Sequence, residues 1–165
     1  MALKGDRYEG MTDVSFFMND TSAAKGGIAV LSTGGSGVAL DQSKALVTYA
    51  STASGNKPVG LLLNDMVNID QTRQHINFHK NEVQKGGKVT LLTNGWVLTN
   101  MIGGETITAG APAYLGATGN LTASQSATGG NAANPPVGRF MSSNDEDGYV
   151  KVHVNIPNVL GDGGV

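Results

Sequence analysis

The chain has 165 residues, of which 39% are hydrophobic, 15% are charged and 24 are glycine; this length fits one domain or two small ones, and few charges with many glycines favour a turn-rich, all-β fold. A net charge of −2 without a basic run excludes a typical nucleic-acid-binding protein. The absence of cysteine excludes disulfides and thiol chemistry, and the sequence has no apolar stretch of about 18 residues that would form a membrane-spanning helix.

Residues 1–12 are mostly polar and show no clear period, which predicts an extended N-terminal arm. Lys4, Arg7 and Tyr8 in this arm are candidate contacts with a partner protein or with another subunit, because an extended segment can lie along the sheet edge of a neighbour. The alternative interpretation of this segment is a disordered terminus.

The next apolar run, residues 14–18, predicts a short strand. Phe16 and Phe17 are adjacent, so a strand must point their rings to opposite faces. Phe17 is a candidate contact residue if its face is open, and a core residue if the strand is buried on both sides.

One structural phrase recurs along the chain: a glycine, a short apolar strand, a turn that contains glycine and a short strand back. The three copies lie at residues 25–40, 84–97 and 107–123. In the central copy, Asn94-Gly95 is typical of a type I′ turn, so we expect a β-hairpin there. Trp96 begins the return strand and is either a core residue or a further candidate contact.

The remaining apolar runs predict further strands, with a surface loop at 123–136, a flexible tail at 158–165 and room for a short helix only near 65–74. These strands are expected at residues 46–49, 58–63, 75–79, 136–141 and 149–156. The run at 58–63 suits a strand buried on both faces. The last run alternates strictly, with its valines on one face and Lys151, His153 and Asn155 on the other.

A Pro-Val-Gly strand follows two of the hairpin phrases, at residues 58–60 and 136–138, which indicates a weak internal duplication. We therefore predict an all-β fold, a β-sandwich or small β-barrel built from two related hairpin units with an extended N-terminal arm. The β-domain would span residues 13–157, as one body or as two lobes at about 13–80 and 81–157.

No reactive constellation accompanies these strands. On a strand, His75 and His79 would lie about 13 Å apart, too far to share one metal ion. The acidic turn at Asp145 to Asp147 lacks the spacing of a calcium loop, and the glycine-rich turns lack the lysine of a phosphate-binding loop. We expect no catalytic, cofactor-binding or metal-binding residues, and no enzymatic activity.

Several short stretches carry glycine, turn and strand patterns in a recurring order. They are AGAPAYLG at 109–116, GNLT at 119–122, PVG at 136–138, DGYVKVHV at 147–154 and the earlier copy at 26–63. In these stretches the chain resembles the head decoration (cement) proteins of tailed bacteriophages, and its MTDVSFFM at 11–18 looks like the opening of cyanophage and marine-phage virion proteins. The resemblance implies a β-sandwich or barrel, often a homo-oligomer, on the outside of a capsid, and it carries no catalytic residue across.

The function expected from these observations is that of a structural virion protein, made in the host cytoplasm, that binds the outer capsid surface and cements adjacent capsomers. The expected partners are the major capsid protein and other copies of the chain, as a trimer or dimer, with no nucleic acid and no membrane. The low charge fits a surface partly covered by a partner. The alternative is a host- or carbohydrate-binding domain of a phage fibre or tail.

Overall fold

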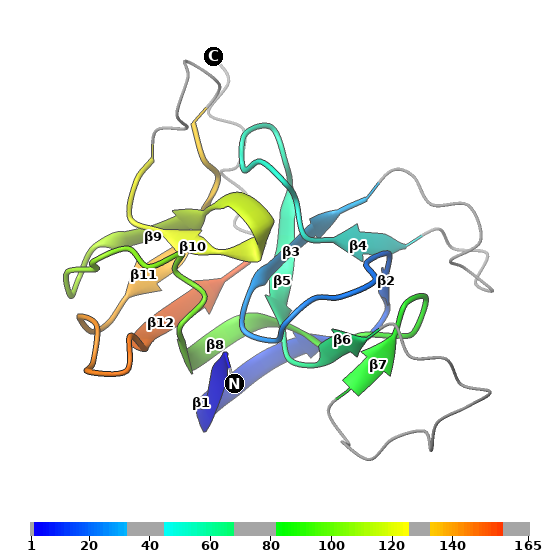
Figure 1. Ribbon diagram of the computed structural model, residues 1–165, viewed down its shortest axis with the longest axis horizontal. Helices are drawn as coiled ribbons and strands as arrows, with labels where there is room; N and C mark the ends of the chain where they lie inside the picture. The colour runs from blue at the N-terminus through cyan, green and yellow to red at the C-terminus, as the bar shows by residue number, and fades with distance from the viewer. Residues whose placement is uncertain (1, 33–44, 68–81, 126–132, 157–165) are drawn as a thin grey trace.

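The computed structural model describes residues 2–32, 45–67, 82–125 and 133–156 (Figure 1). Their regular secondary structure is almost entirely β-strand, and most of it belongs to one large mixed sheet, which confirms the predicted all-β sandwich. The sheet does not close into a barrel. The predicted strand at 75–79, the tail at 158–165, the first hairpin turn near 34–37 and most of the possible helix at 65–74 lie outside the described residues.

In the described segments the strands follow one another, with one short 3-10 helix between β9 and β10. They are β1 (Leu3–Asp13), β2 (Phe17–Met18), β3 (Ile28–Leu31), β4 (Leu46–Thr48), β5 (Pro58–Leu62), β6 (Asp65–Val67), β7 (Glu82–Gln84), β8 (Leu91–Thr99), β9 (Pro112–Leu115), η1 (Ala117–Gly119), β10 (Leu121–Thr122), β11 (Pro136–Phe140) and β12 (Val150–Asn155). The large sheet has the order β10-β9-β11-β12-β8-β5-β3-β4-β2, with β1 also paired to β8, while β6 and β7 form a separate parallel pair.

The central strand β8 runs through Asn94-Gly95 without turning, so the predicted hairpin at this position is wrong. Gly95 does take a positive φ of 153°, but its role is to admit the neighbouring strand: a Cβ at this position would lie 2.1 Å from the carbonyl oxygen of Tyr8. Pairing with strands from distant parts of the chain has therefore overridden the local turn preference of Asn-Gly.

Strand β8 has partners on both of its edges. Residues 94–99 pair with both β1 and β12, and residues 91–92 pair with both β1 and β5. Because a residue has one partner on each edge, β12 and β5 follow one another along the edge opposite β1. Figure 1 shows the consequence, with the two halves of the sheet side by side and β8 and β1 running below both.

The predicted duplication is present in the sheet. Strands β4-β3-β5 of one unit correspond to β10-β9-β11 of the other, and each Pro-Val-Gly strand pairs antiparallel with the first strand of its unit. The register slips at the Pro-Val-Gly segment in both units. Gly60 and Gly138 also share a role, since a Cβ would meet Leu91 of β8 at 2.8 Å and the carbonyl of His153 in β12 at 1.9 Å. The repeated glycine thus lets each unit pack closely against the strand that follows it.

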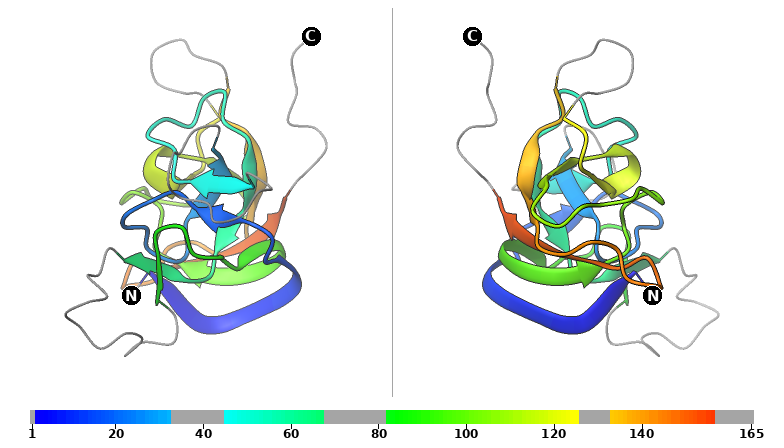
Figure 2. Two further views of the ribbon diagram at one scale, coloured as in Figure 1. Left: turned by 90° about the vertical axis from the view of Figure 1, so that its right-hand side faces the viewer. Right: turned by 90° about the vertical axis from the view of Figure 1, so that its left-hand side faces the viewer.

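Other sequence predictions have mixed outcomes. The predicted strands at 46–49, 136–141 and 149–156 are confirmed as β4, β11 and β12, and the turn near 116–120 is confirmed with η1 inside it. Only the end of the predicted strand at 14–18 is regular, as β2. Much of the predicted arm forms β1, which lies along β8 of its own chain; Figure 2 shows it bending around the outside of the sheet.

The core lies on both faces of the sheet's first unit. The main cluster draws on β1, β3, β5 and β8 to β12, with Leu3, Leu61, Val97, Phe140 and Val152 among its buried residues. A second cluster covers the other face of β3, β4 and β5 and includes Met18, Val47 and Leu62. Adjacent Leu61 and Leu62 thus enter different clusters, which confirms a strand buried on both faces.

Replacing Gly95 by alanine is expected to lower the free energy of unfolding by about 3 kcal/mol, because the new methyl group overlaps the Tyr8 carbonyl and a positive φ strains it further. Gly55→Ala is the matched control: its φ is +75°, but no atom lies within 4 Å of the added Cβ, so the cost is about 1 kcal/mol. Urea titrations of both variants measure the difference. Equal losses would contradict the close approach of β1 to β8.

Leu3→Ala tests whether the N-terminal segment belongs to the core. Leu3 is 2% exposed within the main cluster, so we expect a loss of about 2–4 kcal/mol in unfolding free energy. Met11→Ala on the same strand removes a side chain that is 65% exposed and should change stability by no more than about 0.5 kcal/mol. If the segment were a free arm, the two variants would be equally stable.

Candidate functional site

A row of side chains crosses five neighbouring strands on one face of the sheet. Tyr8 of β1 pairs with Trp96 of β8, Trp96 with His153 of β12, His153 with Arg139 of β11, and Arg139 with Pro112 of β9. Directly paired residues point to the same face, and the residues next to Trp96 and His153 are buried and point to the core. We call this side of β1, β8, β12, β11 and β9 the outer face.

Trp96 is exposed and yet held in place. Its indole is 41% exposed, and the Tyr8 ring, 56% exposed, lies beside it with 5.7 Å between centroids and 38° between planes. From the other side, Lys151 of β12 places its Nζ atom 3.8 Å from the centre of the Trp96 ring, a cation–π contact. Cross-strand aromatic and cation–π contacts therefore hold Trp96, one of the candidate contact residues, in place.

Two methionines extend the apolar part of the outer face. At Gly10 the β1 strand carries one extra residue, which places Met11 opposite Asn94 and therefore on the same face as Tyr8. Met141 follows β11, and its N–H donates to the Lys151 carbonyl at 2.7 Å. Met11 is 65% and Met141 is 55% exposed.

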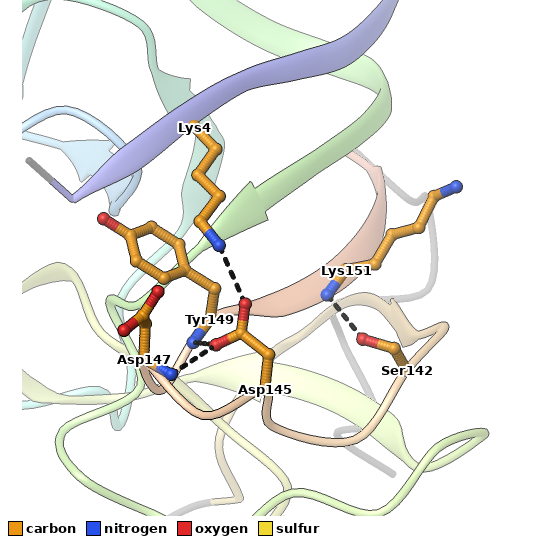
Figure 3. A network of polar contacts seen from close by, with 6 residues as sticks. All are labelled: Lys4, Ser142, Asp145, Asp147, Tyr149 and Lys151. Atoms are coloured by element: carbon orange, nitrogen blue, oxygen red, sulfur yellow. Dashed lines mark hydrogen bonds and ion pairs between the residues drawn. The ribbon is translucent and has the colours of Figure 1, made fainter.

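A polar cluster lies near one end of this face (Figure 3). Lys4 of β1 donates to the Asp145 carboxylate at 2.8 Å, and its Nζ lies 4.2 Å from the centre of the Tyr149 ring. The Asp145 carboxylate also accepts the backbone N–H groups of Tyr149 and Asp147. Asp145 thus stabilises the acidic turn by hydrogen bonds within it and connects it to β1 through Lys4.

These contacts shift the ionisation of both members of the pair. The hydrogen bond from Lys4 lowers the pKa of Asp145, aided by the backbone N–H of Tyr149, and the same bond raises the pKa of Lys4. The stabilisation from Asp145 is present above the unfolded carboxyl pKa and is lost as the pH falls through the folded value. That from Lys4 is lost as the pH rises through its folded pKa. Because both groups are exposed, the effect on stability is small.

The predicted contact residues do not all come together. Lys4, Tyr8 and Trp96 share the outer face. Arg7 lies opposite Val97, on the other face of β1, where its Nε donates to Glu9. Phe17 lies on β2 at the far end of the sheet, partly buried, with the Nζ atom of Lys88 5.4 Å from its ring centre.

Several members of the outer face were not among the residues predicted from the sequence. Alternation in the last strand predicted that Lys151 and His153 share a solvated face, but their neighbours follow from pairings between distant strands. Arg139, Met11 and Met141 carried no signal of their own. The bulge at Gly10, which decides where Met11 points, has no clear mark in the sequence.

Among the described residues no group of three or more His, Cys, Asp or Glu side chains lies close enough to hold a metal ion. His75 and His79 lie outside that part of the chain. The described segments also contain no helix with the length and apolarity that a membrane span needs.

A family model described as structural cement protein (E217 gp24/Pam3 gp6) matches residues 5–155. The chain belongs to this family of phage cement proteins. The match begins in β1 and ends at the last residue of β12, so it spans the whole sheet and the outer face with it. A search of curated proteins finds no match. The chain is thus a structural protein of a phage virion and associates with a capsid.

Lys4→Gln is expected to raise the pKa of Asp145 towards its usual range, leaving only the lowering by the two backbone N–H groups. A pH titration of the Asp145 carboxyl carbon by NMR measures this. Arg7→Gln, which removes the other β1 cation of an exposed ion pair, should leave the Asp145 titration unchanged. An Asp145 pKa that is the same in all three proteins would contradict the pairing in Figure 3.

Proposed function

We propose that this chain binds the outer surface of a phage capsid and cements adjacent capsomers, with the major capsid protein as its principal partner. The observation that carries the proposal is the cement-family match over residues 5–155, which takes in every strand of the main sheet. The exposed aromatic and methionine side chains of the outer face support it, because these residue types are enriched at protein interfaces.

The architecture suits a protein that bears mechanical load on a capsid together with many identical copies. A sheet whose central strand is paired on both edges is stiff. Its two Pro-Val-Gly strands also pack closely against β8 and β12. On a capsid the same contact is repeated at every equivalent position, so modest individual contacts add up through avidity. Such assemblies are usually symmetric, and we propose that the chain acts as a dimer or trimer there.

We also propose that the role is structural and not enzymatic, with no nucleic acid or membrane as a partner. A net charge of −2 supports the first exclusion. A carbohydrate-binding domain of a fibre or tail would need a concave cluster of aromatic rings. Among the described residues the strongly exposed rings are the adjacent pair Tyr8 and Trp96, on a sheet face.

Heads made without this chain should release their DNA at a lower temperature than complete heads, and adding back the purified full-length chain should restore the release temperature. The physical reason is that a bound cement subunit stabilises only the assembled shell. Heads with buffer alone and complete heads are the controls, and electron cryomicroscopy of the restored heads locates the subunit. Failure of the chain to bind, or an unchanged release temperature, would contradict the proposal.

A further inference from the structure

We propose that the outer face is the surface that docks on the capsid protein, and that its counterpart is a capsid segment carrying an apolar side chain flanked by carboxylates. The apolar side chain would sit over the Tyr8–Trp96 pair, with the carboxylates beside Lys151 and Arg139. This inference rests on the proposed function and adds the docking surface and the chemistry of its partner.

The outer face has the shape of a binding surface. The row from Tyr8 to Pro112 crosses five strands, so at the usual strand spacing it is about 19 Å long. Paired residues join its members, although the register of β1 on β8 shifts at three places and that of β11 on β9 at one. The shift after Glu9 adds Met11 to the same side. The result is a continuous row of side chains across the five strands.

Its centre is already ordered. Trp96 is the sole tryptophan of the chain, and it is 41% exposed although most of a tryptophan is usually buried. The ring of Tyr8 and the Nζ atom of Lys151 hold the indole from two sides. A side chain held in one orientation loses little conformational freedom when it binds, which is what an interface anchor requires.

The charges on this face indicate the sign of the partner. Lys151 and Arg139 have no carboxylate within ion-pair distance in the described part of the chain, whereas Lys4, Arg7 and Lys25 each have one. Lys57, Lys85 and Lys88 have none there either, but they lie outside the strands of the outer face. These two cations lie beside the exposed apolar side chains of the outer face, in a chain whose net charge is −2. Such a surface is complementary to a partner that carries carboxylates.

A second copy of the chain fits the face less well. In a two-fold contact centred on Trp96, the same patch is used by both subunits, so each residue near the axis meets its own counterpart. Lys151 lies 3.8 Å from the Trp96 ring and would approach the Lys151 of the other copy, with Arg139 about two strands away on the same side. Like charges would then oppose the contact, whereas an acidic capsid segment neutralises them.

The test is binding of the purified full-length chain to heads that lack it, at low and at high salt. Trp96→Ala should weaken binding by roughly tenfold or more, as for an anchor at the centre of an interface. The double variant Lys151→Glu/Arg139→Glu should weaken binding strongly at low salt and less at high salt, because screening reduces the repulsion. The charge variant keeps the test valid if Trp96→Ala loses stability.

Matched controls come from exposed positions outside the outer face. Leu31→Ala removes a side chain that is 45% exposed on β3, and Lys57→Glu/Lys85→Glu makes the same change of charge at two exposed lysines. Both should bind as the unmodified chain does. Circular dichroism melts check that all variants are folded.

Each outcome decides a separate claim. If the unmodified chain does not bind heads, the proposed function fails and this inference fails with it. If it binds and the outer-face variants bind equally well, only the docking surface is wrong. If those variants bind heads normally but lose self-association in analytical ultracentrifugation, the outer face is a contact between copies, which also overturns the inference.

Discussion

The rest of the structure depends on β8 being hydrogen-bonded along both edges. On one edge lies β1, which comes from the start of the chain, and on the other lie β12, which follows the second duplicated unit, and then β5 of the first unit. β8 therefore connects the two units, and they cannot turn independently. Gly95 makes this possible, since any side chain there would hold the Tyr8 carbonyl away and open the β1 edge.

The duplication was predictable because the same local segment, Pro-Val-Gly, occurs in both units. A Pro-Val-Gly segment slips the register of its pair in both units, and the glycine allows the next strand to come close. The hairpin at Asn94-Gly95 was not predictable in the same way. Its local preference for positive φ is satisfied at Gly95, but whether the chain turns or continues is decided by β1, which begins some ninety residues earlier in the chain. Local sequence carries no information about that pairing.

The same limit applies to the candidate site. Residue type alone pointed to Lys4, Tyr8 and Trp96, and the structure places them on one face; Arg7 and Phe17 had equal claims from the sequence and lie elsewhere. A strand's alternation says which of its side chains share a face. It does not say which strand lies alongside, so the row that joins β1 to β9 follows only from registers between residues far apart in the chain.

Stability and the outer face are connected through β1. β1 buries Leu3 in the main core opposite Thr99 and, after a register shift, sets the Tyr8 ring beside Trp96, so the strand contributes one side chain to each side of the sheet. Trp96 cannot turn inward, because its neighbours in β8, Gly95 and Val97, occupy the core side. Its ring therefore lies at the surface, where Tyr8 and Lys151 limit its motion. A change that frees β1 would loosen the core and the anchor together, which ties the rigidity of this face to the folding of the whole sheet.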